Sequence, residues 1–61
     1  MSLKTLLHEK GIKQKWLADQ LNVSEMTVSS WCNGKSTPRQ KRADQIVLLL
    51  NISKDELNRA L

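Results

Sequence analysis

The chain has 61 residues, of which ten are Lys or Arg and six are Asp or Glu, and its formal net charge is +4 at pH 7. Its longest apolar run, Ile46–Leu50, is far shorter than the ~20 residues that a membrane-spanning helix needs. The one cysteine, Cys32, excludes an internal disulfide, and with a single histidine it cannot form a structural zinc site. We therefore expect one small domain, residues 1–61, in a reducing cytoplasm, with no membrane partner, metal, cofactor or small-molecule ligand.

The positive charge is concentrated in the middle of the chain. Residues 10–42 carry a net charge of +5, residues 1–9 carry none, and residues 43–61 carry −1. A basic stretch of this kind is typical of a surface that neutralises nucleic-acid phosphates. The alternative is that the lysines merely solvate a small helical surface.

Apolar residues recur at helical spacing throughout, and no segment shows the alternation typical of a β-strand. A first helix is predicted from about Leu3 to Lys10, with Ser2 as its N-cap and Gly11 as a left-handed stop. The pattern indicates an all-α fold.

Two short helices joined by a tight turn are predicted in the middle of the chain. They cover about Gln14–Leu21 and Glu25–Cys32, with Asn22 and Val23 in the turn and Ser24 as N-cap of the second helix. The Asn33-Gly34 pair ends that second helix.

Two more helices complete the prediction. Thr37 is expected to cap the fourth helix with Pro38 at its first position, where the missing N–H costs nothing. Its inward stripe is Ala43, Ile46, Val47 and Leu50. A Ser-x-x-Glu capping box at residues 53–56 opens the fifth helix, which turns Leu57 and Leu61 toward the core.

The central helix pair, residues 14–32, has the features of a helix-turn-helix. Ala18 is small enough for a close helix crossing, Val23 can lock the turn, and Val28 and Trp31 can anchor the second helix from below. Its outward side chains are small, polar or flexible, as expected of a helix that projects its first residues into the DNA major groove. These outward residues are Glu25, Met26, Ser29 and Ser30.

From Leu3 to Leu57, the chain resembles the Cro/C1-type (Xre-family) helix-turn-helix domains of phage repressors and bacterial regulators. The matching motifs are Leu6 followed by Gly11, Gln14 with Leu17-Ala18, Val23-Ser24, Thr27-Val28, Trp31, Asn33-Gly34-Lys35, Pro38, and the closing Leu-Asn-Ile-Ser-x-x-Glu-Leu. The resemblance implies a compact five-helix, lambda-repressor-like fold with a central helix-turn-helix.

The resemblance also implies roles for matching residues. Gln14 is expected to form a hydrogen bond to a phosphate and to support the second helix of the pair, which reads the bases in this family. Ser24 lies where the family contacts bases or nearby phosphates. The expected base-reading residues are Glu25, Met26, Thr27 and Ser30. The expected phosphate-binding residues are Gln14, Lys13, Lys15, Ser24, Asn33, Lys35, Arg39, Lys41 and Arg42. For the three basic residues at the start of the fourth helix, a plain solvated face is the alternative.

Two positions depart from the family pattern. Glu25 and Met26 stand where donors such as glutamine or arginine are common. A carboxylate can accept a hydrogen bond from cytosine N4, and a thioether can pack on a thymine methyl group. Lys13 replaces the usual Ser or Thr cap of the second helix, which loses about 1 kcal/mol of capping but adds a cation.

The function predicted from the sequence is a sequence-specific double-stranded DNA-binding regulator, most simply a repressor from a bacterium or phage. It is expected to bind as a two-fold homodimer, with a weak dimer surface near Leu57, Arg59, Ala60 and Leu61. The chain offers no nucleophile–base pair, paired carboxylates or phosphate loop, so no enzyme is predicted.

The alternative function is an antitoxin-like or adaptor module that binds another protein. Its contact surface would include Trp16 and Met26 or the C-terminal leucines. Cys32 is expected to be a partly exposed residue at the end of its helix, and Trp31 is expected to lie in the core.

Overall fold

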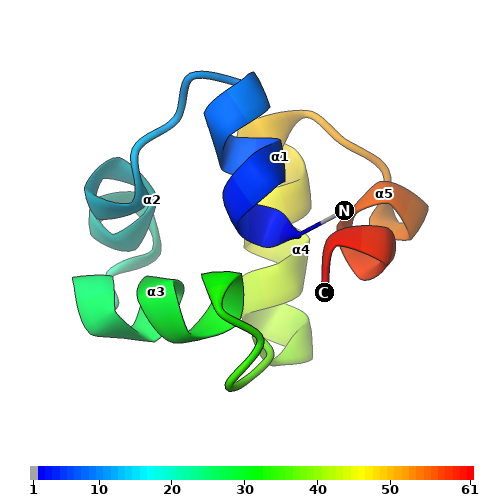
Figure 1. Ribbon diagram of the computed structural model, residues 1–61. Coiled ribbons are helices and arrows are strands. Elements are labelled where there is room, and N and C mark those ends of the chain that lie inside the picture. The colour runs from blue at the N-terminus through cyan, green and yellow to red at the C-terminus, as the bar shows by residue number, and fades with distance from the viewer. Residues whose placement is uncertain (1) are drawn as a thin grey trace.

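The computed structural model describes residues 2–61, which form five α-helices and no β-strand (Figure 1). The helices are α1 (Leu3–Glu9), α2 (Gln14–Leu21), α3 (Glu25–Cys32), α4 (Gln40–Leu50) and α5 (Lys54–Ala60). Helices α2 and α3 lie on one side of the molecule and α5 lies on the other. Helix α1 contacts α3 and α5, and α4 contacts α2 and α5. The predicted all-α, five-helix fold is confirmed.

Three helices begin at a serine whose side chain caps the first turn. The capping bonds run from the Thr5 N–H to Ser2 Oγ (3.1 Å), from the Thr27 N–H to Ser24 Oγ (3.2 Å) and from the Glu56 N–H to Ser53 Oγ (3.0 Å). Each bond satisfies a backbone donor that has no partner within the helix. Helix α2 begins instead at Lys13, which makes no side-chain capping bond, as the sequence predicts.

The C-terminal end of α3 is closed by a glycine. Gly34 has φ +74°, in the left-handed region where a side chain would be strained. Its N–H donates to the Trp31 carbonyl at 3.3 Å, and the Lys35 N–H donates to the Ser30 carbonyl at 2.9 Å. These two bonds form a Schellman motif, which stops the helix and turns the chain toward α4.

The start of α4 differs from the prediction. Thr37 does not cap the helix, because the N-cap is Arg39, whose backbone is extended (φ −70°, ψ 164°). Pro38 therefore precedes the cap instead of occupying the first helical position. A proline holds its own φ near −65°, which suits both a first helical residue and an extended residue. The proline alone could not determine which of the two it would be.

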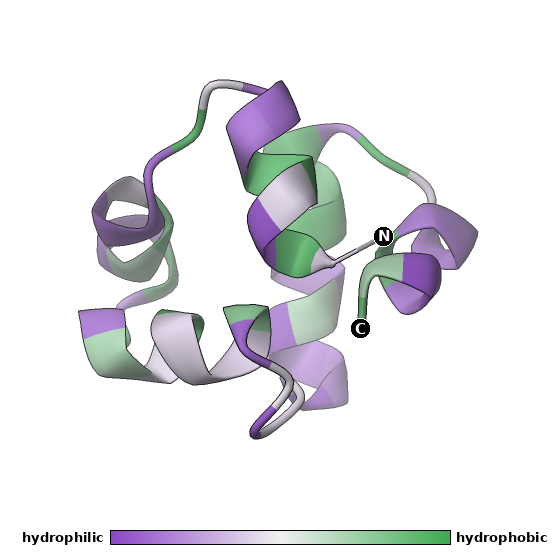
Figure 2. Ribbon diagram, viewed as in Figure 1, coloured by the Kyte–Doolittle hydropathy of each residue, from purple (hydrophilic) through white to green (hydrophobic). Residues whose placement is uncertain are grey.

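Apolar side chains from all five helices form one core. The largest fully buried side chains are Leu3, Leu6, Leu7, Leu17, Leu21, Val28, Ile46 and Leu57. Figure 2 shows hydrophobic residues on α1 and the adjoining part of α4, and hydrophilic residues on the first turns of α4 and on α5. Trp31 is only 6 % exposed, so its predicted place in the core is confirmed.

Two leucines in segments with a strong apolar pattern lie at the surface. Leu48 is 80 % exposed, although it belongs to the apolar run Ile46–Leu50. Residues two apart do not share a helix face, so burial of Ile46 and Leu50 turns Leu48 outward. Leu61, which the sequence places toward the core, is 41 % exposed because it follows the last turn of α5.

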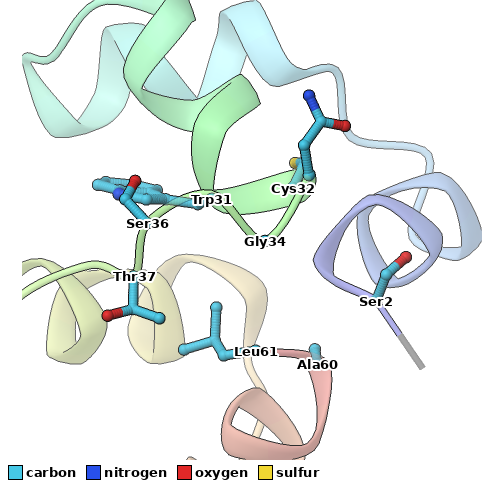
Figure 3. Close-up of a pocket in the computed structure, with 9 residues that line it drawn as sticks. Ser2, Trp31, Cys32, Gly34, Ser36, Thr37, Ala60 and Leu61 are labelled. Carbon is cyan, nitrogen blue, oxygen red and sulfur yellow. The ribbon is translucent and has the colours of Figure 1, made fainter.

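The prediction of a partly exposed Cys32 is wrong, because this side chain is only 7 % exposed. It lines a shallow groove of about 320 Å³ between the end of α3, the loop that follows and the end of α5 (Figure 3). Burial raises the pKa of the Cys32 thiol, and the positive charge of Lys4 opposes this shift in pKa. The helix-end position suggested exposure, but α1 packs against α3 and helps to cover it.

Replacing Trp31 with alanine should remove a large part of the stability of the domain. Loss of a buried tryptophan costs about 3–5 kcal/mol, and the free energy of unfolding expected for a domain of this length is roughly 3–9 kcal/mol. The other tryptophan, Trp16, is 43 % exposed and provides the matched control. Thermal unfolding followed by far-UV circular dichroism should show a much larger decrease in Tm for Trp31→Ala than for Trp16→Ala. Equal decreases in Tm would contradict the assignment of Trp31 to the core.

The Cys32 thiol should make stability depend on pH in the alkaline range. Its pKa in the folded chain lies above the ordinary value of 9.0, so its contribution to stability is present below that pH and is lost as the pH rises through the folded-state pKa. Urea unfolding at several pH values between about 8 and 10.5 should show that the free energy of unfolding falls more steeply with pH for the native chain than for Cys32→Ala. Parallel pH profiles for the two proteins would show that burial of the thiol is not linked to stability.

Candidate nucleic-acid interface

Helices α2 and α3 form the most extensive helix–helix contact of the fold. Ala18 is 2 % exposed and Val23 is half-buried against the core, as the sequence predicts. Asn22 takes the left-handed conformation (φ 57°) at the end of α2, and the Val23 N–H donates to the Ala18 carbonyl at 3.0 Å. A helix, a three-residue turn and a second helix packed on the first are the elements of a helix-turn-helix.

Helix α3 has a buried inner face and an open outer face over only eight residues. Val28, Trp31 and Cys32 are buried. At 3.6 residues per turn, Met26 and Ser30 lie on the opposite side, where Met26 is 80 % exposed and Ser30 is half-buried. The outward direction expected for these two residues is therefore confirmed.

The predicted base-reading residues in the first turn of α3 differ in their exposure to solvent. Glu25 and Met26 are exposed, whereas Thr27 is half-buried. The Thr27 hydroxyl lies 2.8 Å from Ser24 Oγ, so the two hydroxyls share a hydrogen bond beside the capping bond. Thr27 and Ser24 are thus partly occupied with each other, which leaves Glu25 and Met26 as the free side chains of this turn.

One residue of the outer face, Ser29, was not among the predicted contacts. It is half-buried, and its hydroxyl accepts a hydrogen bond from Asn33 Nδ2 at 3.4 Å. Ser29 follows Glu25 by one helical turn and precedes Asn33 by one, so the i, i+4 spacing could have placed all three along one edge. This edge joins the first turn of α3 to the loop after it.

The predicted phosphate-binding residues fall into two groups by exposure. The exposed ones are Lys13, Lys15, Ser24, Asn33, Lys35, Arg39 and Lys41, and the half-buried ones are Gln14 and Arg42. Arg42 Nη1 donates to Gln45 Oε1 at 3.0 Å, so part of its guanidinium is used within α4. Arg42 is therefore less free than Arg39 or Lys41 to meet an external anion.

The basic residues among them come from two segments, one before α3 in the chain and one after it. One segment is the start of α2 with Lys13 and Lys15, and the other is the loop after α3 with the first turn of α4. Figure 1 shows α3, that loop and the start of α4 along one edge of the molecule. Positive charge therefore both precedes and follows α3 along the chain.

Of the three acidic residues of the C-terminal part, Asp44 lies on α4 and accepts a hydrogen bond from Gln40 Nε2 at 2.9 Å. Asp44 pairs with Lys54 at 3.6 Å, and both side chains are about half or more exposed, so this ion pair adds little stability. Asp55 and Glu56 lie in the first turn of α5, on the side of the molecule away from α2 and α3. Helix α5 carries these two carboxylates together with Lys54 and Arg59, so it has no net formal charge, whereas the two basic segments are net positive.

Other kinds of site find little support within residues 2–61. No group of three or more His, Cys, Asp or Glu side chains could hold a metal ion there. None of the helices in this part of the chain has the length and apolar character needed to cross a membrane. The groove beside Trp31 and Cys32 is shallow, and it borders the loop that carries Asn33 and Lys35 (Figure 3).

Comparison with known proteins agrees with this geometry. A family model described as helix-turn-helix matches residues 3–57, which is nearly the whole chain. Neither the curated proteins nor the solved structures include a significant match. The matched family consists of DNA-binding domains of transcriptional regulators and is not a family of enzymes. With the packed α2–α3 pair and the match over residues 3–57, this chain belongs to the Cro/C1-type helix-turn-helix family of DNA-binding transcriptional regulators.

Proposed function

We propose that this protein binds double-stranded DNA at specific sequences and represses transcription there, with α3 inserted into the major groove. The observation that carries the proposal is the two-sided character of α3. Three buried residues hold the helix in place, while Met26 and Glu25 face solvent at its N-terminal end. Repression requires only that the protein occupies its site, and a rigid reading helix suffices for that.

We assign base reading and phosphate binding to different residues. The proposed base-reading set is Glu25, Met26 and Ser30, with Thr27 in a lesser role because its hydroxyl is bonded to Ser24. The proposed phosphate contacts are those of the two basic segments, with Lys35, Arg39 and Lys41 as exposed cations in the loop after α3 and at the start of α4. Contacts to phosphates set affinity and position, and contacts to bases set specificity.

The proposed functional unit on DNA is a homodimer. Eight residues of α-helix span only about 12 Å, which is about a third of a helical turn of DNA. Two copies that read half-sites one turn apart would specify an operator. Leu57 and Ala60 are 2 % and 5 % exposed, so they cannot serve as the dimer surface that the sequence suggested. Arg59 and Leu61 are exposed and remain candidates.

A second candidate function, an antitoxin-like or adaptor module, is favoured by an apolar flank. Trp16 is 43 % exposed beside Gly11 and Ile12, and Leu48 is 80 % exposed beside Gln20. Exposed apolar side chains mark protein contacts when they join into one patch, and these two lie on the packed helices α2 and α4. Trp16→Ala should leave DNA binding unchanged under the leading proposal. A protein that binds no duplex, but loses a protein partner on Trp16→Ala, would support the second function instead.

Reversing the charge of Arg39 should weaken DNA binding without changing sequence preference. Binding of labelled duplexes should fall for every sequence alike, and the slope of log affinity against log salt should decrease by about 0.9 for each phosphate that Arg39 neutralises in the native complex. Lys54→Glu makes the same charge change at an exposed position on α5 and should have a much smaller effect. Equal reductions in affinity for Arg39→Glu and Lys54→Glu would mean that net charge, and not this face, governs binding.

A duplex selected from random sequences should contain two symmetric half-sites about 34 Å apart and should bind two copies of the chain. Sedimentation of the complex would give the stoichiometry, and a duplex with only one half-site should bind far more weakly. A single copy bound with full affinity to one half-site would contradict the homodimer. Failure of any duplex to compete better than random DNA would contradict sequence-specific binding itself.

A further inference from the structure

The exposed side chains at the start of α3 have an unusual chemical composition for a helix that reads bases. Glu25 is its only charged residue, and Met26 beside it is the most exposed large apolar side chain of the helix, at 80 %. The helix contains no Arg, Lys, Asn or Gln. Guanine is commonly read by Arg or Lys and adenine by Asn or Gln. The side chains of α3 therefore do not match the usual contacts to purines.

A carboxylate only accepts hydrogen bonds, so Glu25 needs a donor on the base edge. In the major groove the donors are the amino groups N4 of cytosine and N6 of adenine. On adenine, the acceptor N7 lies beside N6 and would repel the carboxylate. On cytosine, the neighbour of N4 is the carbon C5, which carries no lone pair. Electrostatics therefore favours cytosine as the partner of Glu25.

Met26 supplies the matching apolar contact. Its side chain is unbranched and flexible, so it can adapt to the apolar part of the base edge that Glu25 reaches. We propose that Glu25 and Met26 together read the N4 and C5 edge of one cytosine, and that methylation of this cytosine at C5 strengthens binding. This inference rests on the proposed insertion of α3 into the major groove.

A single base would thus satisfy both residues, since 5-methylcytosine carries the donor and the methyl group side by side. Thymine has the methyl group but presents an acceptor, O4, in place of the donor. Glu25 should therefore reject thymine at the position where it favours 5-methylcytosine. If Met26 alone recognised the methyl group, thymine and 5-methylcytosine should bind equally well. If Glu25 and Met26 act together, only 5-methylcytosine should be favoured.

The test uses the duplex obtained by selection, with each half-site cytosine replaced singly by 5-methylcytosine and by thymine. At one position, methylation should increase the affinity of the native chain about fourfold, as expected for burial of one further methyl group. Thymine at the same position should lower it. Met26→Ala should abolish the gain, and Glu25→Gln should shift the preference at that position toward adenine. Ser29→Ala, on the same helix, is the matched control and should keep the gain.

The outcomes separate this inference from the proposed function. If a specific duplex is found but methylation never increases affinity, or the gain survives in Met26→Ala, the inference is wrong and the proposed function stands. Thymine binding as well as 5-methylcytosine would overturn reading by the pair. If no duplex is preferred over random DNA, both fail. Circular dichroism of each variant should match the native chain, because Glu25 and Met26 are exposed.

Discussion

The anchoring of α3 is the interaction on which the rest of the interface depends. An isolated helix of eight residues is unstable in water, because nucleation costs more than so few hydrogen bonds return. Helix α3 therefore exists because Val28, Trp31 and Cys32 are buried against the other helices and because Ser24 caps its start. The same burial sets the rotation of the helix. Met26 and Ser30 point outward only as long as those three residues remain inside.

The net positive charge lies in the segments that flank α3 in the sequence. Lys13 and Lys15 precede α3, and a larger basic group follows it, whereas α5 has equal numbers of acidic and basic residues. A surface with net positive charge attracts a polyanion before contact forms. Glu25, in contrast, places a negative charge at the start of α3, the helix proposed to read bases. Under that proposal, Glu25 repels DNA phosphates at non-specific sites and is compensated only where a base supplies a hydrogen-bond donor.

Much of the fold could be predicted from local chemistry. The bounds of α2 and α3 agree with the prediction, and the serine caps and Gly34 set helix ends through contacts within a few residues. The start of α4 could not be predicted in this way, because Pro38 is compatible with two backbone conformations. The burial of Cys32 and the exposure of Leu48 and Leu61 also depend on which helices cover which faces, and no single helix contains that information.

The five helices, the buried face of the α2–α3 pair and the family could all be inferred from sequence patterns, because periodicity, caps and turn residues act over short distances. Which side chains are covered depends instead on how the helices pack. Leu57 and Cys32 are buried because other helices lie against them. The hydrogen bonds of Thr27 with Ser24 and of Arg42 with Gln45 each span three residues, and they depend on side-chain rotamers that the apolar pattern does not indicate. Glu25 and Met26 remain the exposed pair in the first turn of α3.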